Sequence, residues 1–343
     1  MARIGILTGG GDCPGLNAVI RAVVRKGAGH HGDAIVGFRN GWRGVLEGSV
    51  VELTAENTRG LLHRGGTILG TSRTNPFSVE GGLDLVKETL RSYRIAGLVV
   101  VGGEGTLSCA AKMAAEGVNV VGVPKTIDND IAATDFTFGF DTAVQVATDA
   151  IDRLHSTAES HNRVMLLEVM GRHAGWIGLY AGLAGGADVI LIPEHPFDIE
   201  EVCHHLRHRH ASGHVFSIVV VSEGAEPAKG SLQVPAHERD IFGRPKLGGI
   251  SYLVADEIER RTGSEARVTI LGHVQRGGSP TAADRVLATR YGVAAVDLAS
   301  EGRWGRMVAL RGGEIVDVPI DEAVASLKVV PAHLYEVAEV FFG

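Results

Sequence analysis

Cysteine is scarce in this chain: Cys13, Cys109 and Cys203 are the only three among 343 residues. They are an odd number, far apart and without C-x-x-C spacing, so we expect a reducing compartment with no structural disulfide and no zinc site. Long apolar runs are also missing. Runs such as residues 218–221 are strand-sized, whereas a membrane span needs about 20 apolar residues. The apolar part of the opening segment MARIGILTGGG is too short for a signal peptide. We therefore expect a soluble, cytoplasmic protein that does not enter a membrane.

Positive charge is in deficit, with 33 Lys and Arg against 40 Asp and Glu and a net charge of −7. No run of basic residues offsets this deficit, which argues against a nucleic-acid-binding surface. Hydrophobic residues at 45% and charged residues at 21% exclude a disordered or fibrous chain. Glycine, by contrast, is abundant: 47 residues without a G-x-y repeat exclude collagen. Despite the negative net charge, the backbone N–H groups of glycine loops could bind phosphate locally.

Six short apolar runs, rich in β-branched residues, are each followed directly by a polar loop, and five of these loops contain glycine. The runs are residues 3–8, 97–101, 118–123, 164–169, 215–221 and 267–271. Such runs predict strands buried on both faces of a parallel sheet. Stretches with helical periodicity at 16–26, 83–93 and 140–155 lie between them. We therefore predict an α/β protein of two Rossmann-like, open parallel-sheet domains facing a cleft, with ligands beyond the carboxyl ends of the strands.

Two of these loops have the composition of a phosphate site. The first glycine loop, residues 9–12 (GGGD), lies between a strand and a helix, where backbone N–H groups approach a phosphate. A tight turn that binds nothing fits equally well, and neither the dinucleotide fingerprint nor the P-loop motif is properly present. The second glycine loop, residues 102–106 (GGEGT), adds Glu104, which suits a Mg²⁺ that nucleotide phosphates also hold. We expect Thr106 to cap the following helix; a cap with an incidental glutamate is the alternative.

A third loop, residues 125–130 (KTIDND), gathers carboxylates where a buried strand ends; we call it the acidic loop. Asx turns account for part of this run, and a carboxylate beside an acceptor hydroxyl can act as general base. Five arginines lie beside these loops and strands: Arg73, Arg163, Arg172, Arg267 and Arg276. Each alone is typical of a surface residue. Together they suit a substrate or leaving group dense in phosphate.

Seven motifs, in order along the chain, closely resemble those of the phosphofructokinase family. They are GGGDCPGLN, GGTILGTSR, GGEGT, PKTIDND, MGRHAGW, SEGA and LGHVQRGGSPTAADR. The resemblance runs from about residue 3 to about residue 300. It implies ATP or diphosphate as phosphoryl donor, fructose 6-phosphate as acceptor, and a homotetramer or homodimer whose substrate sites borrow residues across an interface. It also implies a donor-binding domain of residues 1–139 plus about 275–325, and a sugar-phosphate domain of 140–274 plus about 326–343.

The resemblance assigns roles to matching positions. Asp128 matches the catalytic base for the sugar 1-hydroxyl, with Thr126 and Asp130 beside it, and Arg172 matches the group that stabilises the transferred phosphoryl. The nucleotide site is implied at Gly10, Arg73, Thr74, Gly103, Glu104, Gly105, Thr106 and Lys125, with Glu104 at the Mg²⁺ position, where the family commonly has Asp, and Asp130 helping to place the ion. Sugar-phosphate contacts are implied for Thr126, Ile127, Asp128, Met170, Gly171, Arg172, Glu223, His273, Val274, Gln275 and Arg276. Arg163 and Arg267 match a pair that reaches in from the neighbouring subunit.

The chain departs from the family in two regions. Members regulated by ADP and phosphoenolpyruvate carry a basic Lys-Lys-His run where this chain has residues 212–214 (SGH), and an arginine where it has His155, although Arg21 and Arg25 are kept. Residues 230–249 lack periodicity and are typical of a long surface excursion.

We therefore expect an ATP-dependent, Mg²⁺-dependent 6-phosphofructokinase. A diphosphate-dependent phosphotransferase is the alternative, because Lys125 is the residue of diphosphate-using relatives while Gly105 is that of ATP-using ones. A carboxylate at 105 would repel the nucleotide α-phosphate, whereas a lysine at 125 excludes neither donor, so Gly105 favours ATP. An NAD-dependent dehydrogenase is a further alternative, but the chain lacks the acidic residue that would bind the ribose at a strand end about 20 residues after the first glycine loop. The presence of Asp128 and Arg172 argues against a catalytically dead binding protein.

Overall fold

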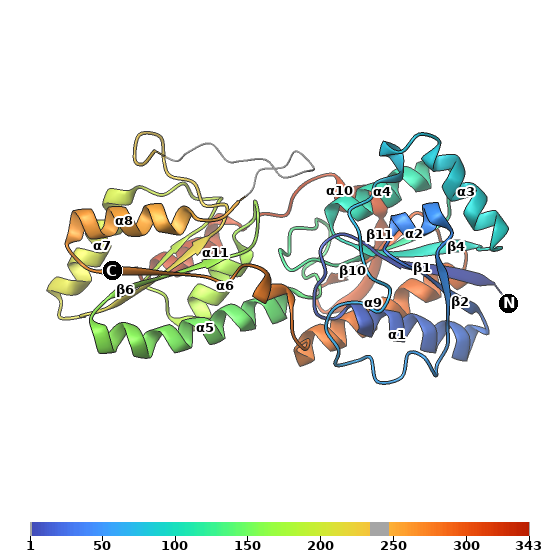
Figure 1. Ribbon diagram of the computed structural model, residues 1–343, viewed down its shortest axis with the longest axis horizontal. Coiled ribbons are helices and arrows are strands. Elements are labelled where there is room, and N and C mark those ends of the chain that lie inside the picture. Colours follow the sequence, from blue (N-terminus) through green and yellow to red (C-terminus); the bar gives the residue numbers. More distant parts are fainter. Residues whose placement is uncertain (1, 234–246, 343) are drawn as a thin grey trace. The chain divides into compact units, whose positions relative to one another are not determined.

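The computed structural model describes residues 2–233 and 247–342. The chain forms two compact units, each with its own sheet (Figure 1). Unit 1 comprises Met1–Thr142 and Arg276–Leu327, and unit 2 comprises Ala143–Gln275 and Lys328–Gly343. Residues 234–246 of the predicted surface excursion lie outside the described residues.

Unit 1 is built on a seven-stranded sheet in the order β11-β10-β5-β4-β1-β2-β3. Its strands are β1 (Arg3–Thr8), β2 (Ala34–Phe38), β3 (Val50–Leu53), β4 (Gly97–Gly102), β5 (Val120–Pro124), β10 (Arg306–Arg311) and β11 (Glu314–Pro319). The five inner strands run parallel, and the two edge strands, β3 and β11, pair antiparallel with their neighbours. The inner strands β4 and β5 are buried along their whole length, as expected for strands covered by helices on both faces.

Helices cover both faces of this sheet (Figure 1). They are α1 (Leu16–Lys26), which continues into the π-helix η1 (Gly27–His31), α2 (Trp42–Glu47), the 3₁₀ turn η2 (Pro76–Ser78), α3 (Gly82–Ser92), α4 (Glu104–Ala115), α9 (Ala282–Ser300) and α10 (Ile320–Val324). Helices α1 and α9 pack together on one face. Helices α2, α3, α4 and α10 form the other face, where Trp42, Val86, Leu107 and Ile320 join one apolar core with strand residues such as Leu98.

Unit 2 is built on a four-stranded parallel sheet in the order β7-β8-β6-β9. Its strands are β6 (Val164–Val169), β7 (Val189–Leu191), β8 (Ser217–Ser222) and β9 (Ala266–Ile270), and its helices are α6 (Trp176–Gly185), α7 (Ile199–Ala211), α8 (Ile250–Thr262) and α11 (Ala332–Glu339). Helix α5 (Phe140–His161) begins in unit 1 and continues in unit 2, and the 3₁₀ turn η3 (Gly272–Arg276) crosses the boundary in the other direction. Helices α7 and α8 share a core with β6, β7 and β8 through residues such as Cys203, Val254 and Leu166.

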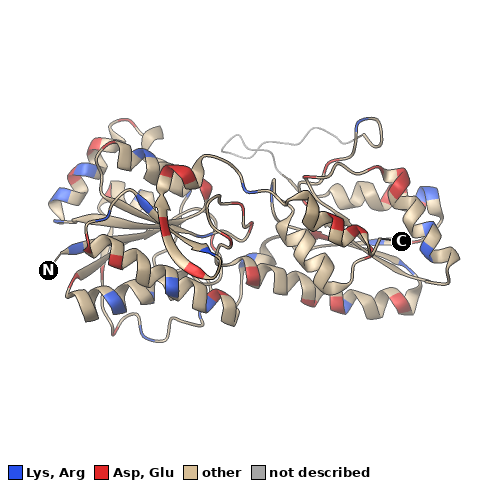
Figure 2. Ribbon diagram, turned by 180° about the vertical axis from the view of Figure 1, so that it is seen from behind, with Lys and Arg blue, Asp and Glu red and all other residues tan. Residues whose placement is uncertain are grey.

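The predicted α/β class with parallel sheets is confirmed, and the differences lie at helix ends and in strands that were not predicted. Helix α1 spans the predicted residues, whereas α5 continues six residues beyond the predicted end, to His161. Strands β2, β3, β7, β10 and β11 were not predicted. Of these, β3 and β7 have only four and three residues, too few for a periodic signal. Basic and acidic residues are interspersed along the helices of both units (Figure 2). Within the described residues, no helix combines the length and the apolarity needed to span a membrane.

Candidate active site

The two glycine loops and the acidic loop meet at the carboxyl ends of β1, β4 and β5 in unit 1. The N–H of Gly9 donates to the carbonyl of Val101 at 2.9 Å, and the N–H of Lys125 donates to the carbonyl of Gly102 at 2.9 Å. The N–H of Gly10 donates to the carbonyl of Ser72 at 3.0 Å, so Arg73 and Thr74 follow directly at the same loop cluster. Parallel strands in register thus bring together segments that are more than a hundred residues apart in the sequence, and all of them carry predicted phosphoryl-donor residues.

Side chains pack closely against two glycines of the first glycine loop. A Cβ on Gly9 would lie 2.7 Å from Oγ1 of Thr106, and a Cβ on Gly11 would lie 2.5 Å from Nη1 of Arg276. Both distances are shorter than any ordinary carbon contact, so a side chain would displace Thr106 or Arg276. Gly10 has a φ of +80°, in the left-handed region that glycine adopts without cost. The loop therefore has the glycine-dependent shape of a strand-to-helix phosphate loop.

Two cations lie against the carbonyl groups of this loop. Nζ of Lys125 donates a hydrogen bond to the carbonyl of Gly11, and Nη1 of Arg276 donates to the carbonyl of Asp12 at 3.3 Å. Lys125 is buried, and burial lowers the pKa of its ammonium group, while the nearby Asp128 and Asp12 act in the opposite direction. Burial likewise raises the pKa of the neighbouring Cys13 thiol to about 12, so this cysteine stays protonated.

The second glycine loop forms the N-terminus of α4, and here one prediction is wrong. Helix α4 begins at Glu104, and Gly103 is its N-cap residue, with no side-chain cap. Thr106 therefore does not cap the helix. Its side chain is buried under Gly9 and Gly102, because neither glycine has a Cβ to exclude it. Glu104 and Gly105 are exposed in the first turn, which leaves the carboxylate and the helix N–H groups open to a ligand.

Glu104 alone does not form a protein-only metal site. Its Oε1 accepts a hydrogen bond from Oγ of Ser108 at 3.1 Å. In the part of the chain that the structure describes, no three His, Cys, Asp or Glu side chains gather to hold a metal ion. This arrangement fits Mg²⁺, which proteins commonly bind through one or two carboxylates together with substrate phosphates and water.

Asp128 is a buried carboxylate in the acidic loop. Only 5% of the residue is exposed, its N–H is bonded to Oγ1 of Thr126 at 3.0 Å, and the described residues supply no hydrogen-bond partner for its Oδ1. Asn129, in the left-handed region at a φ of +52°, holds the loop through its Oδ1, which accepts the N–H of Thr137 at 3.1 Å. A buried carboxylate oxygen without a partner is costly. The loop therefore holds a group ready to accept a proton or a hydroxyl hydrogen bond.

In unit 2, most of the predicted sugar-phosphate residues meet at the carboxyl ends of β6, β8 and β9. The N–H of Met170 donates to Oε1 of the fully buried Gln275 at 2.8 Å, and the N–H of Arg172 donates to Oε1 of Glu223 at 3.1 Å. Arg172 has a φ of +54°, an uncommon conformation for a residue with a side chain. His273 and Val274 are exposed in η3 just before Gln275. The structure thus gathers Met170, Gly171, Arg172, Glu223, His273, Val274 and Gln275 at one edge of the sheet.

Arg276, which the sequence groups with the sugar-phosphate contacts, directly follows Gln275, and its Nη1 donates to the carbonyl of Asp12 in the first glycine loop. Two other predicted arginines lie elsewhere. Arg163 and Arg267 lie at the opposite, amino-terminal edge of the unit 2 sheet. The six-residue strand β6 separates Arg163 from Met170, which is roughly 20 Å of extended chain. Within one chain, Arg163 and Arg267 therefore do not join the residues around Met170.

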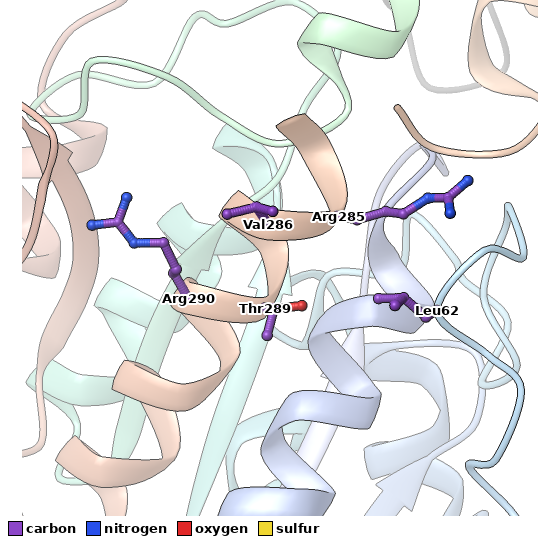
Figure 3. A pocket seen from close by; sticks show the side chains of 5 residues that line it. All are labelled: Leu62, Arg285, Val286, Thr289 and Arg290. Atoms are coloured by element: carbon purple, nitrogen blue, oxygen red, sulfur yellow. The ribbon is translucent and has the colours of Figure 1, made fainter. Parts of the chain in front are cut away.

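A separate pocket of about 210 Å³ lies on α9 in unit 1 (Figure 3). Its lining is Leu62, Arg285, Val286, Thr289 and Arg290, none of which is a predicted site residue. The two arginines extend to opposite sides, and each donates to a backbone carbonyl, Arg285 to Pro280 at 2.8 Å and Arg290 to Gly313 at 2.6 Å. Because both guanidinium groups are held by backbone and point apart, this pocket does not have the converging charges of a phosphate site.

The role of Asp284 was not predicted, although the last of the seven family motifs contains this residue. The buried carboxylate of Asp284 accepts hydrogen bonds from the N–H groups of Gly139 and Thr142, both at 2.8 Å, and so holds the start of α5. Burial raises the pKa of this carboxyl to about 6. The only signal was the spacing Thr281-x-x-Asp284, which resembles a local capping box. Thr281 does cap α9, but the carboxylate reaches a different helix.

The chain is similar over nearly its whole length to known proteins. The family profile described as Phosphofructokinase matches residues 3–299. The chain is 58% identical over 341 residues to the pyrophosphate–fructose 6-phosphate 1-phosphotransferase of Amycolatopsis methanolica, covering 99% of this chain and 100% of that protein. It is 56% identical over 342 residues to the ATP-dependent 6-phosphofructokinase of Mycobacterium bovis, with the same coverage of 99% and 100%. The solved structure of phosphofructokinase from Saccharomyces cerevisiae matches with a TM-score of 0.80 and 33% identity, over 99% of this chain and 47% of that one.

Proposed function

Because the chain belongs to the phosphofructokinase family, we propose that it transfers the γ-phosphoryl group of ATP to the 1-hydroxyl of fructose 6-phosphate. The products are fructose 1,6-bisphosphate and ADP. In this reaction the bond between the sugar O1 and the γ-phosphorus forms, and the bond from that phosphorus to the β,γ-bridging oxygen breaks. The proton of the 1-hydroxyl is taken by a base. The reaction is a step of glycolysis, and its catalysis rests mainly on positioning and on stabilisation of charge.

The observation that carries this proposal is the buried Oδ1 of Asp128, for which the described residues offer no hydrogen-bond partner. A substrate hydroxyl supplies the missing donor, and the same contact lets the carboxylate accept the proton as the O1–phosphorus bond forms. Asp128 lies at the end of β5, in the loop whose first residue, Lys125, is bonded to the first glycine loop. The base and the phosphoryl-donor loops are therefore parts of one rigid sheet edge.

The phosphoryl-donor half of the site is proposed from unit 1. Gly10, Arg73 and Thr74 with Gly103 to Thr106 bind the nucleotide, and Lys125 and Arg276 face its phosphates. Each cation is bonded to a loop carbonyl, a weak partner that a phosphate oxygen can replace. Glu104, with help from Asp130, is the proposed holder of Mg²⁺. When bound, this ion neutralises charge on the donor phosphates.

The acceptor half of the site is proposed from unit 2, together with Thr126 and Ile127 of the acidic loop. Met170, Gly171, Glu223 and His273 to Gln275 are proposed to bind the sugar phosphate, and Arg172 to stabilise the transferred phosphoryl group. The hydrogen bond from the N–H of Arg172 to Glu223 ties two of these residues together. Gln275 holds the N–H of Met170, so these residues are mutually positioned.

We further propose an oligomer, a homotetramer or a homodimer, in which Arg163 and Arg267 bind the sugar phosphate of a neighbouring subunit. Their position at the amino-terminal edge of the unit 2 sheet supports this proposal, because in their own chain they are a strand length away from Met170. The edge strand β9 supports it as well. Ile270 at its end is 43% exposed and Val274 just beyond is 66% exposed, and an exposed apolar sheet edge favours association.

Diphosphate is the second candidate donor. Lys125 favours it, since the lysine adds a cation at the first glycine loop, and the Amycolatopsis relative is named for this donor. Gly105 favours ATP, because the exposed first turn of α4 carries no side chain there that would repel a nucleotide. The proposal therefore keeps ATP as the donor.

The test is an assay of the purified protein with ATP and with diphosphate, each with fructose 6-phosphate and Mg²⁺, measuring fructose 1,6-bisphosphate. We expect turnover with ATP and a higher kcat/KM for ATP than for diphosphate. A thermal-unfolding control separates the dehydrogenase alternative: Mg-nucleotide should raise the Tm, and NAD should not. Absence of fructose 1,6-bisphosphate with both donors would refute the proposal.

A further inference from the structure

The amino-terminal ends of β6 and β9 carry the two arginines to which the proposed function gives a neighbour's sugar phosphate. In the chain itself, both guanidinium groups bind one carboxylate, that of Glu265. We propose that Glu265 is an internal counter-ion that takes the place of the substrate phosphate on Arg163 and Arg267 and is displaced by it. Glu265 thereby sets the affinity for fructose 6-phosphate. For its substrate, this inference rests on the proposed function.

Strand register brings the three side chains together. Val164 and Ala266 are partners in the parallel pair β6–β9, and the N–H of Val164 donates to the carbonyl of Glu265 at 2.9 Å. Nε of Arg163 donates to Oε2 of Glu265 at 2.7 Å, and Nη2 of Arg267 donates to its Oε1. Each oxygen of the Glu265 carboxylate thus accepts a hydrogen bond from one of the two guanidinium groups. Two oxygens of a phosphate can bridge two arginines in the same way.

In this arrangement both terminal nitrogens of the Arg267 guanidinium already have hydrogen-bond partners. Its Nη1 donates to the carbonyl of Ala266 at 2.7 Å and lies 3.3 Å from Oε1 of Glu259. Bidentate binding of a phosphate needs two parallel N–H groups, so Arg267 must release at least one present partner. Glu265 is the partner that can leave, because its side chain is 42% exposed and bonds to no backbone N–H in the hydrogen bonds among described residues.

Charge makes this release an exchange of anions. The hydrogen bond from Arg163 lowers the pKa of Glu265, so the carboxyl group is ionised at neutral pH. An incoming phosphate therefore replaces one anion with another on the same two arginines. Glu259 and Glu265, with Gly263 and Ser264, also line a pocket of about 260 Å³, so the exchange takes place beside space open to solvent anions.

Two nearby glutamates, Glu259 and Glu257, differ from Glu265 in their contacts and serve for comparison. Oε1 of Glu259 accepts the N–H of Ala266 at 2.8 Å and closes the connection from α8 to β9. Glu257, on the same helix, resembles Glu265 in chemistry only: it pairs with Arg260 at 2.6 Å and Arg261 at 2.7 Å, neither of which is a predicted site residue. Glu257→Gln is therefore a matched control for Glu265→Gln, with the same change of charge and the same loss of a two-arginine pair.

The experiment compares wild type, Glu265→Gln, Glu265→Asp and Glu257→Gln. We expect Glu265→Gln to lower the KM for fructose 6-phosphate roughly two- to tenfold, the range expected when one or two exposed ion pairs are lost. The kcat and the KM for ATP should stay at wild-type values. Inorganic phosphate should become a stronger competitor of the sugar phosphate by a similar factor. Glu265→Asp, which keeps the charge, should remain near wild type, and Glu257→Gln should leave all these constants unchanged.

A lower KM for fructose 6-phosphate in Glu265→Gln would identify Glu265 as a counter-ion. If Glu265 had a structural role, its replacement would disturb this edge of the unit 2 sheet and raise that KM. An unchanged or raised KM for fructose 6-phosphate in Glu265→Gln would overturn the proposal. Titration of inorganic phosphate in thermal unfolding gives the same comparison without turnover. If the wild type fails to phosphorylate fructose 6-phosphate, the proposed function fails. Tighter phosphate binding by Glu265→Gln then still supports the counter-ion, and equal binding still overturns it.

Discussion

The ammonium group of Lys125 donates a hydrogen bond to the backbone carbonyl of Gly11, so the acidic loop is fastened to the first glycine loop by a buried cation. Burial lowers the pKa of this group, which means that the charged form is held at a cost in stability. A protein tolerates such a cost where the charge serves a ligand. The two loops that Lys125 joins are those to which we assign the donor phosphates and the catalytic base.

Replacement of Lys125 by Met should therefore separate stability from function. We expect Lys125→Met to raise the KM for the phosphoryl donor roughly 10- to 100-fold, the value of a hydrogen bond to a charged group. The KM for fructose 6-phosphate should change little. The Tm should rise, because an apolar chain of similar length replaces a desolvated ammonium group. Lys112→Met, at an exposed position of α4, is the control and should change neither quantity. An unchanged donor KM in Lys125→Met would remove Lys125 from the donor site.

Asp128→Asn should fold normally and lose turnover by roughly 10²- to 10⁴-fold, the usual contribution of a general base. The amide keeps the shape of the side chain and cannot take up the proton of the sugar 1-hydroxyl. The kcat of the variant, measured at saturating substrates alongside a thermal melt, checks this expectation. A variant that kept more than about a tenth of the wild-type kcat would show that another group is the base.

Arg163→Ala and Arg267→Ala should each raise the KM for fructose 6-phosphate far more than the KM for the phosphoryl donor. Because these arginines are proposed to serve a neighbouring subunit, either variant mixed with Asp128→Asn should form hybrid oligomers with some intact sites. Activity after mixing and reassociation, compared with the sum of the separate activities, is the measurement. If no mixture regains activity, the shared-site proposal fails while the family assignment stands.

The fold and the family could be predicted because their signals are local. A buried β-branched run followed by a polar loop identifies β1, β4, β5, β6 and β8 from short windows of sequence, and the predicted class and family are confirmed. The short strand β7 and the edge strand β3 gave no such signal, because three or four residues carry no periodicity. The expected cap at Thr106 failed for a related reason. The helix begins at Glu104, three residues before the start that a cap at Thr106 implies, and the composition of the loop does not locate that start.

Contacts between distant residues could not be predicted. Arg163 and Glu265 are 102 residues apart and meet only because β6 and β9 pair in one register. Asp284 reaches Gly139 across 145 residues, whereas the local sequence indicates only the start of a helix. The resemblance to a family indicates which residues act on substrates. It does not indicate residues such as Glu265 and Asp284, which pair with those residues or hold the elements that carry them. Those emerge only from the paired strands and packed helices.

The clamp at Asp284 gives a prediction for pH. Its pKa is raised from 3.8 to about 6 by burial, so between these values the folded protein binds more protons than the unfolded one. The contribution of this group to stability should therefore fall as pH rises from about 4 to about 6, and stay constant above. The shift corresponds to roughly 3 kcal/mol at most.

The measurement for Asp284 is the free energy of unfolding of wild type and of Asp284→Asn from pH 4 to pH 8. The variant should be less stable throughout, because an amide supplies one acceptor oxygen where Gly139 and Thr142 now meet two. The difference between the two proteins should be largest near pH 4 and shrink towards pH 6. A difference independent of pH would mean that Asp284 does not titrate in this range.

We propose that positions 105 and 125 decide which phosphoryl donor the protein uses. Gly105 is exposed in the first turn of α4 and Lys125 is buried under the first glycine loop. A carboxylate at 105 would therefore stand in the proposed nucleotide site, while the lysine would accept phosphates of either donor. Gly105→Asp should therefore abolish most turnover with ATP, and Lys125 should then support measurable turnover with diphosphate. The matched control is Gly105→Asn, which has the same shape without the charge and should lose less ATP activity. The kcat/KM of all three proteins with each donor, at saturating fructose 6-phosphate and Mg²⁺, is the test. A wild-type preference for diphosphate would show that the cation at 125 outweighs the open position at 105, and equal losses in the Asp and Asn variants would show that size rather than charge controls entry.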